Sequence, residues 1–535
     1  MSAQPPPPDI SSPADPEHDP RATFAVDPAL VRRLAARVVA SGEPHTSYAP
    51  FTGQPVATIA TSTSQDVAGA VELARAAQRS WCRVPLELRA QILLTFHDLV
   101  LDRQPELLDL IQWESGKARK HAFEEIAHVA MTARYYARTA GRHLAPTRRL
   151  GIYPILTRVE HRRVPRGVVG IISPWNYPLT MALADGIPAI VAGNAVVHKP
   201  DWQTSVTALY GIDLLIQAGM PADLWQPVIG AGPVVGSAVV DTADYVCFTG
   251  STATGRTIAA QAASRLVGTS LELGGKNPML VLRDADVDRA AEGAVRACFS
   301  SAGQLCVATE RLYVADQVYE RFMQRFVARI EAMRLSPALD FSADMGSLVS
   351  TAQLDTVVAH VDDARRKGAT VVVGGQPRPD IGPLFYQPTV LTGVNPGMTC
   401  FDEETFGPVA SVYRFTDEAD AVARANDGDY GLNASIYTRD AVRGRTLARQ
   451  IHCGSVNVNE GYAASFGSID APMGGLRSSG LGRRQGAEGI QRYTESQTIA
   501  TQRVLPFAPV LGMSEESHER ALTATLRVLK RLGRA

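Results

Sequence analysis

GVVGIIS, residues 167–173, is the first of five short apolar runs that decide the fold class. The others follow in order: AVVHKP (195–200), WQPVIG (225–230), YVCFTG (245–250) and TSLELGG (269–275). Several of the spans between them have the apolar spacing of helices. Parallel strands that are buried on both faces have continuous apolar sequences, so this series predicts an α/β fold with a doubly wound, Rossmann-like sheet. Such sheets bind ligands at the carboxyl ends of their strands.

Residues suited to ligand binding follow these runs. Trp175 and Asn176 follow the first run, Lys199 lies in the second, and Gly232 follows the third. The fourth leads into FTGSTATG, residues 248–255, whose two glycines lie at a strand-to-helix junction. The free N–H groups of such a helix start can bind a phosphate, but glycines there are also common packing devices. The chain has no GxGxxG, so both interpretations stay open.

A cysteine in FSSAGQLCVATERLYV, residues 299–314, is the candidate nucleophile. Cys306 lies between a Gly-Gln turn and a run that predicts a strand, where rigid elements could direct a thiolate into a cleft. A small buried hydrophobic residue is the alternative. Glu272 ends an apolar run, where desolvation would raise its pKa and suit it to act as a base; a surface or ion-paired carboxylate is the alternative.

Five motifs together resemble the aldehyde dehydrogenase superfamily: GQLC, LELGGKNP, PWNYP, HKP and FTGSTATG. The resemblance covers about residues 50 to 499. Within the superfamily the chain most resembles bacterial NADP-linked succinate-semialdehyde dehydrogenases, including the late segments YGLNASIYT, VNVNEGYA and YTESQTIAT.

This resemblance implies oxidation of an aldehyde to an acid through a cysteine thiohemiacetal and a thioester. Cys306 would attack the carbonyl, the Asn176 amide and the Cys306 N–H would stabilise the oxyanion, and Glu272 would activate water. Lys199 completes the catalytic set, since its ammonium after an apolar run needs a partner such as a ribose hydroxyl. The expected cofactor-binding residues are Trp175, Asn176, Lys199, Trp202, Gly232, Gly250, Ser251, Gly255, Leu273, Glu404 and Phe406.

Several departures from the family bear on cofactor and substrate. Trp202 stands where NAD-preferring relatives place a glutamate that repels the 2′-phosphate, so NADP is expected, with NAD as the alternative. Ala184 and Ser300 replace the arginines of the animal succinate-semialdehyde enzymes, and Cys306 has no second cysteine two residues away. Succinate semialdehyde remains the expected substrate, with the 462–470 loop as one place to look for its binding residues.

Three other functions stay open. A broad aliphatic or aromatic aldehyde dehydrogenase would fit the missing arginines. An acylating relative would pass the acyl group to coenzyme A, although Glu272 favours water as the acceptor. A catalytically silent binding or structural protein could use the same scaffold.

The composition is that of a globular protein with two or three domains, with 535 residues of which 45% are hydrophobic. Lys plus Arg (53) nearly equals Asp plus Glu (54), which argues against nucleic acid as a partner. The six cysteines lack the spacing of zinc sites, so we expect no metal, and reduced thiols in the cytoplasm. The apolar runs are well short of the roughly 20 residues that cross a bilayer, so no transmembrane segment is expected.

The expected domains follow from these patterns and from the resemblance. Residues 1–24 read as a disordered Pro-rich tail. A cofactor-binding domain would comprise residues 25–146 and 167–274, and a catalytic α/β domain residues 275–492. The resemblance makes residues 147–166 and 493–503 a small β oligomerisation arm of a homodimer or homotetramer. Residues 504–535 form a tail with an amphipathic helix, either docked or a weak surface anchor.

Overall fold

The computed structural model describes residues 27–152, 157–502, 506–510 and 512–533. The expected Pro-rich tail, residues 1–24, lies outside them. The chain forms two compact units, Met1–Ala140 with Pro165–Tyr493, and Gly141–Val164 with Thr494–Ala535. In the described part of the chain, no helix has both the length and the apolar character needed to cross a bilayer.

A six-stranded sheet in the first unit confirms the predicted fold class. Its order is β17-β9-β8-β5-β6-β7, and the apolar runs supply its five parallel strands. Their bounds are β5 (Val168–Ile172), β6 (Ala195–Lys199), β7 (Trp225–Pro227), β8 (Tyr245–Thr249) and β9 (Gly268–Glu272). Every residue of β5 and β6 is buried, as continuous apolar strands require. β17 (Gly480–Leu481) pairs antiparallel with β9.

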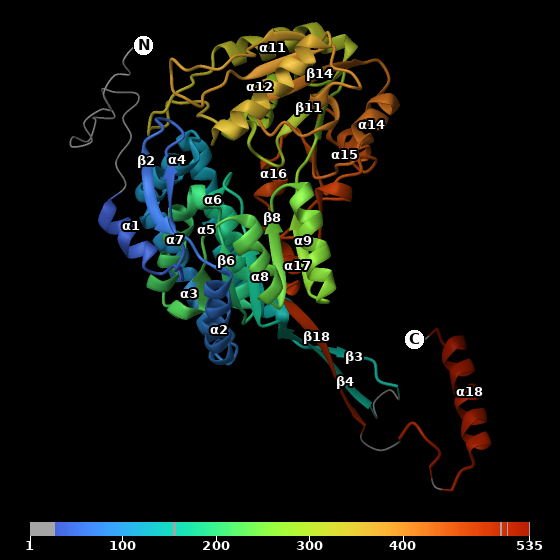
Figure 1. The fold of residues 1–535 in the computed structure, drawn as a ribbon. Coiled ribbons are helices and arrows are strands. Elements are labelled where there is room, and N and C mark those ends of the chain that lie inside the picture. Colours follow the sequence, from blue (N-terminus) through green and yellow to red (C-terminus); the bar gives the residue numbers. More distant parts are fainter. Residues whose placement is uncertain (1–26, 153–156, 503–505, 511, 534–535) are drawn as a thin grey trace. The chain divides into compact units, whose positions relative to one another are not determined.

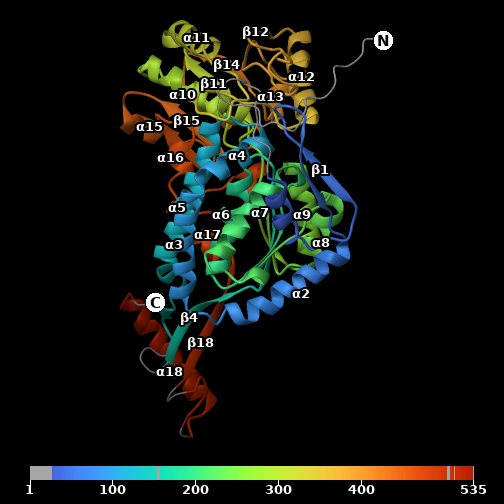
Figure 2. The ribbon, with the colours of Figure 1, turned by 90° about the vertical axis from the view of Figure 1, so that its left-hand side faces the viewer.

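Helices cover both faces of this sheet, as Figures 1 and 2 show. The helices on one side are α2 (Ser64–Trp81), α8 (Ser237–Thr242) and α9 (Thr252–Ser264). Those on the other are α6 (Pro178–Val191) and α7 (Ser205–Gln217), with α1 (Pro28–Ala35), α3 (Leu86–Asp102) and α4 (Gln104–Ser115) packed outside them. α5 (Arg119–Leu144) and the β1 (Pro44–Tyr48) and β2 (Pro55–Ala60) hairpin complete the region.

The strand order creates a switch point beside β5. The chain builds outward from β5 through β6 to β7, then returns to the other side of β5 with β8 and β9. The loops after β5 and β8 therefore leave the sheet in opposite directions, and doubly wound sheets bind their ligands at such a point.

A seven-stranded sheet follows, with order β12-β13-β14-β11-β10-β15-β16. All neighbours except β12 and β13 are parallel. Its strands are β10 (Asn277–Val281), β11 (Thr309–Ala315), β12 (Thr370–Val373), β13 (Thr389–Thr392), β14 (Val409–Phe415), β15 (Asn433–Tyr437) and β16 (Ser455–Val458). Its helices are α10 (Val287–Phe299), α11 (Asp316–Glu331), α12 (Thr351–Arg366), α13 (Thr399–Asp402), α14 (Glu418–Asn426), α15 (Ala441–Ala448) and α16 (Ala463–Phe466), and α17 (Gly486–Gln491) follows β17.

The second unit contains a three-stranded sheet with order β18-β4-β3. Its strands are β3 (Thr147–Arg149), β4 (Thr157–Pro165) and β18 (Thr494–Gln502). The last helix is α18 (Glu515–Arg531), none of whose described side chains is buried.

Candidate active site

The carboxyl ends of the parallel strands collect most of the predicted site residues. Since all five strands run in the same direction, these residues lie along one edge of the sheet. Trp175 and Asn176 follow β5, Lys199 ends β6, Gly232 follows β7, Gly250 follows β8 and Glu272 ends β9.

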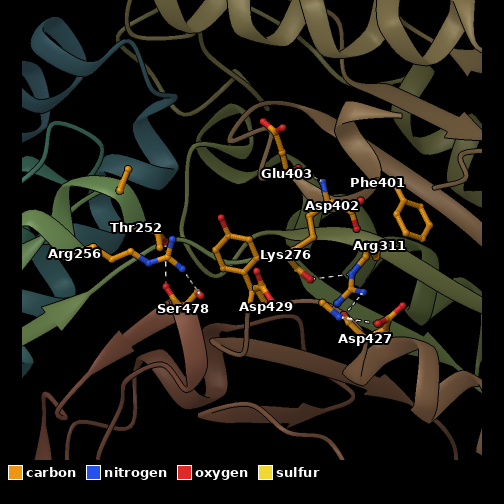
Figure 3. Close-up of a pocket in the computed structure, with 13 residues that line it drawn as sticks. Thr252, Arg256, Lys276, Arg311, Phe401, Asp402, Glu403, Asp427, Asp429 and Ser478 are labelled. Atoms are coloured by element: carbon orange, nitrogen blue, oxygen red, sulfur yellow. Dashed lines mark hydrogen bonds between the residues drawn. The ribbon is translucent and has the colours of Figure 1, made fainter. Parts of the chain in front are cut away.

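A cavity of about 450 Å³ adjoins this edge (Figure 3). Thr252 and Arg256 of α9 line it from one side, and Lys276 and Glu403 from another. None of the predicted site residues lines it, although Thr252 directly follows Ser251. The cavity is therefore a neighbour of the predicted cofactor site.

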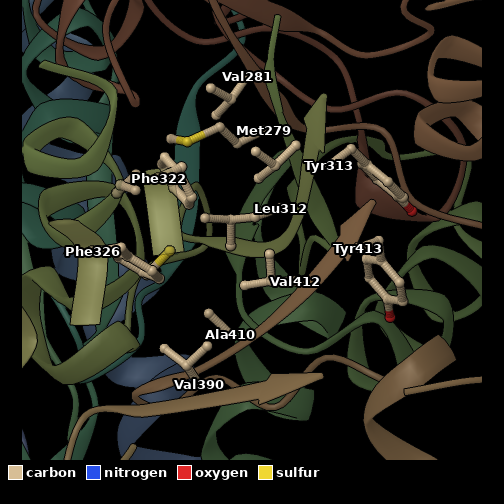
Figure 4. Packing of buried hydrophobic residues seen from close by; sticks show 14 of the residues in the cluster. Met279, Val281, Leu312, Tyr313, Phe322, Phe326, Val390, Ala410, Val412 and Tyr413 are labelled. Carbon is tan, nitrogen blue, oxygen red and sulfur yellow. The ribbon is translucent and has the colours of Figure 1, made fainter. Parts of the chain in front are cut away.

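Strand β11, which follows the Cys306 turn, is anchored by side chains on both of its faces (Figure 4). Leu312 is fully buried on the side of Phe322 and Phe326 from α11. On the other face Tyr313 stacks on Tyr413 of β14, with ring centroids 5.2 Å apart. A nucleophile that precedes so fixed a strand has a well-defined position.

The turn that carries Cys306 has an unusual backbone. Ser301 and Ala302 have φ of 52° and 56°, in the left-handed region that costs a non-glycine residue about 1–3 kcal/mol. Gly303 follows with φ of 70°, and a Cβ there would lie 2.1 Å from the carbonyl oxygen of Gly407. The turn therefore requires glycine at this point, and the surrounding contacts must hold its strained residues in place.

Two amide side chains supply these contacts. Asn277 donates from Nδ2 to the carbonyl oxygens of Cys306 (2.8 Å) and Ala308 (2.7 Å). Gln304 donates to the Ser301 carbonyl at 3.1 Å, and its own Oε1 accepts from the N–H of Val349 at 3.0 Å. Asn277 is not among the predicted site residues, although its place in LELGGKNP, at the start of an apolar run, was an available signal.

The Asn176 amide points to the Cys306 turn. Its Nδ2 donates to the carbonyl oxygen of Gln304 at 3.0 Å, which leaves its second amide hydrogen for another acceptor. Lys117 holds the Asn176 backbone, since its ammonium lies 2.6 Å from both the Asn176 carbonyl and the Glu125 carboxylate. The amide is thus fixed before any substrate arrives.

Burial and three charged groups set the protonation of the Cys306 thiol. Burial raises its pKa to about 12; Arg484 opposes this rise, whereas the carboxylates of Glu272 and Glu404 add to it. Burial also raises the pKa of Glu272 to about 7, again opposed most strongly by Arg484. At neutral pH the thiol is therefore protonated, and Glu272 is divided between an acid and a base form. Glu272 can accept a proton there.

An apolar cluster packs against Cys306. Its members are Tyr177, Met181, Leu305, Val307, Ala308, Leu432, Tyr462, Phe466 and Met473. The hydroxyls of Tyr177 and Tyr462 each donate to the Glu124 carboxylate at 3.1 Å. Ser301 donates to the Tyr177 hydroxyl at 3.1 Å. The polar edge of the cluster is thus centred on an acid.

Lys199 and Glu404 provide the test of whether a dinucleotide fits. The Lys199 ammonium has no hydrogen bond or ion pair to any described residue, although the side chain is almost completely buried and burial lowers its pKa. The Glu404 carboxylate accepts the N–H of Gly275 at 2.8 Å, and burial raises its pKa to about 8. Beside it Trp175 and Phe406 meet edge to face at 5.6 Å. An unpaired ammonium and a partly satisfied carboxylate fit a group that offers hydroxyls.

The residues of the FTGSTATG turn serve two structural purposes, close packing and helix capping. A Cβ at Gly255 would lie 2.5 Å from Cδ2 of Leu273, so this glycine permits close packing. Ser251 caps α9 by accepting the N–H of Thr254 at 3.3 Å. The remaining N–H groups of the helix start can still bind a phosphate, and a Cβ at Gly232 would meet only open space.

Trp202 lies apart from the thiol, in a short 3₁₀ turn after β6. Its ring stacks on His45 of β1, with centroids 3.9 Å apart and planes within 6°. The residue is 37% exposed, so Trp202 is partly open to solvent and is not a core residue.

Comparisons with known proteins show the family of this chain. The model of the aldehyde dehydrogenase family matches residues 38–499. A protein of Mycolicibacterium smegmatis, provisionally named succinate-semialdehyde dehydrogenase [NADP(+)], is 52% identical over 482 residues, 90% of this chain and 93% of its own. The crystal structure of an E. coli NADP dependent enzyme has a TM-score of 0.83 at 34% identity and covers 86% of this chain and 95% of its own. A crystal structure of betaine aldehyde dehydrogenase from Staphylococcus aureus in complex with NAD+ has a TM-score of 0.84 at 30% identity, covering 91% of this chain and 98% of its own. This chain belongs to the aldehyde dehydrogenase family.

Proposed function

We propose that this protein oxidises succinate semialdehyde to succinate with NADP+. The observation that carries the chemistry is that a thiol, an amide and a carboxyl from separate elements are brought together: the amide bonds the turn that carries the thiol, and the carboxylate acts on the pKa of the thiol. The three groups are Cys306 on its strained turn, the Asn176 amide after β5, and the Glu272 carboxyl at the end of β9.

In the first step the Cys306 sulfur bonds to the aldehyde carbon while Glu272 takes the thiol proton. The oxyanion that forms accepts hydrogen bonds from the Asn176 amide and the Cys306 N–H. When bound, the nicotinamide serves as the acceptor of the hydride, and the carbon is left as a thioester.

Hydrolysis completes the cycle. Water bonds to the thioester carbon, and Glu272 accepts the proton of that water. The carbon–sulfur bond then breaks, the acid leaves, and the sulfur departs as the thiolate. Glu272 must give up its first proton to solvent before this step, which a pKa of about 7 allows.

The cofactor proposal assigns hydroxyl contacts to Lys199 and Glu404, a phosphate contact to the Ser251 turn and an apolar wall to Trp175 and Phe406. NADP is favoured over NAD because Trp202 places no carboxylate near the adenosine ribose. The name of the Mycolicibacterium smegmatis relative supports both NADP and succinate semialdehyde.

A second candidate function is oxidation of uncharged aldehydes, and the acid at Glu124 favours it. The hydroxyls of both tyrosines in the apolar cluster donate to Glu124. Ala184 and Ser300, which replace the arginines of the animal enzymes, supply no positive charge for a substrate carboxylate. An ionised Glu124 would repel the carboxylate of succinate semialdehyde. Burial raises the pKa of Glu124, and a protonated Glu124 could instead donate to that carboxylate.

Initial rates with succinate semialdehyde and with butanal, each with NADP+ and NAD+, test the proposal. The first function predicts that kcat/KM is highest for succinate semialdehyde with NADP+. A higher value for butanal favours the second function. Glu124→Gln then gives the reason: if charge repulsion limits the anionic substrate, its KM falls in the variant while that of butanal does not. No turnover of any aldehyde would contradict both.

Assembly and location are part of the same proposal. We assign subunit contact in a homodimer or homotetramer to the β18-β4-β3 sheet, cofactor binding to residues 25–146 and 167–274, and catalysis to residues 275–492. Because all six cysteines are free thiols, we place the enzyme in the cytoplasm.

A further inference from the structure

A buried group of charged side chains lies next to Glu272. Arg484 and Arg492 each place a guanidinium nitrogen 2.6 Å from a different oxygen of Asp185. These three side chains are less than one tenth exposed. Arg484 also donates to the hydroxyl of Thr249 at 3.0 Å, so its guanidinium is held in one orientation.

One nitrogen of Arg484 remains unused. Its Nε has no hydrogen-bond partner in the described part of the chain, and neither has Oε1 of Glu272; both atoms are inaccessible to solvent. The two atoms lie 4.0 Å apart. A small movement of the Glu272 side chain would therefore form a charge-assisted hydrogen bond.

The charges in this group balance only when Glu272 is ionised. Two arginines face one aspartate, which leaves one positive charge, and a buried unpaired charge is costly. Four charged groups act on the carboxyl of Glu272. Its ionised form is favoured by Arg484, Arg492 and Arg483 and is opposed by Asp185. Arg484 is the strongest of the three, and it also favours the thiolate of Cys306, which Glu272 and Glu404 oppose.

We propose that Arg484, clamped by Asp185, is a positioning residue that orients Glu272 and favours its ionised form near neutral pH. The inference rests on the proposed role of Glu272 as the base. Sequence position gives no hint of it, because Asp185, Glu272 and Arg484 come from α6, β9 and the turn after β17.

Two variants with opposite expected effects test this role. Arg484→Met removes the positive charge. In a plot of kcat against pH, the region where kcat rises with pH, the rising limb, should therefore move to higher pH by at least one unit. Activity at pH 7 should fall about fivefold or more and recover on raising the pH. Asp185→Asn removes the negative charge, so the same limb should move to lower pH. Loss of packing alone would lower kcat at every pH and could not shift the limb in opposite directions.

Arg484→Lys is the matched control, because it keeps the charge and should restore most of the pH profile. A readout without substrate or cofactor is alkylation of Cys306 by iodoacetamide, followed by peptide mass measurement. At fixed pH, Arg484→Met should slow it several-fold relative to Arg484→Lys. If Arg484→Met does not fold, the proposal is tested by the predicted shift of the pH profile of Asp185→Asn to lower pH. An unchanged limb in the folded variants would overturn the proposal. If instead Glu272→Gln turned over like the parent enzyme, the proposed role of Glu272 would be the error.

Discussion

Asn277 and Cys306 are joined by a hydrogen bond of 2.8 Å from the Asn277 amide to the Cys306 carbonyl oxygen. The same amide bonds the carbonyl of Ala308, so one buried side chain holds the backbone of the nucleophile and of the residue two positions after it. A misplaced reacting group costs up to about a hundredfold in rate.

Asn277→Ala should therefore lower kcat by about ten- to a hundredfold and destabilise the fold by roughly 1–3 kcal/mol, because it leaves buried carbonyls unpaired. Steady-state kinetics and thermal unfolding measure the two effects. Asn395→Ala is the control, since Asn395 also bonds a backbone carbonyl but on an exposed loop. An Asn277→Ala enzyme with the parental kcat would show that the bond does not position Cys306.

Cys306→Ala should abolish aldehyde oxidation, because the thiol forms the covalent intermediates. Cofactor binding should be unchanged, since the thiol acts only on the carbonyl; NADPH fluorescence titration measures it. Cys82→Ala is the matched control, a half-buried free thiol at the end of α2. Oxidation that persists in Cys306→Ala would exclude the thiol from the reaction.

The fold could be predicted from the sequence because its signals are local. Each buried parallel strand is a continuous apolar run, and the residue after each run falls at the same sheet edge by topology alone. Other features could not be predicted because they join distant segments. β17 lies over two hundred positions after its partner β9, and Asp185 meets Arg484 across 299 positions. The motif predicts phosphate contact for Gly255, and that stays a prediction; the close packing of Leu273 on this glycine joins separate elements and could not be predicted.

Trp202→Glu should shift preference from NADP+ toward NAD+. A carboxylate near the 2′-phosphate that adds about 1.4 kcal/mol of repulsion changes the ratio of kcat/KM values by about tenfold. The substitution also removes the stack on His45, so Trp202→Gln is the control that loses the ring without adding charge. If both variants shift the ratio equally, the stack and not the charge decides preference. An unchanged ratio in both would place Trp202 away from the ribose.

The pH dependence of turnover should follow Glu272. Burial raises its pKa to about 7, and only its ionised form can accept a proton from water. Where hydrolysis limits turnover, kcat should rise by about tenfold per pH unit below pH 7 and level off above it. Rates with saturating substrate from pH 5.5 to 9 measure the profile. A limb centred near pH 4.5, the ordinary range of a glutamate, would show that burial does not control this carboxyl.

The central claim is that Glu272 serves the hydrolysis of an acyl-enzyme on Cys306, and a stopped-flow record of NADPH formation by Glu272→Gln tests it most directly. Cys306 and Asn176 are unchanged in this variant, so one NADPH per site should form in a burst. Steady turnover should then be about a hundredfold or more below the parent rate. Intact-protein mass measurement should find a substrate-derived adduct that is absent from the Cys306→Ala, Glu272→Gln double variant. If Glu272 also deprotonates the thiol, the burst will be slower and will recover at higher pH while hydrolysis does not. Turnover at the parental rate, or neither burst nor adduct at any pH, would contradict the account.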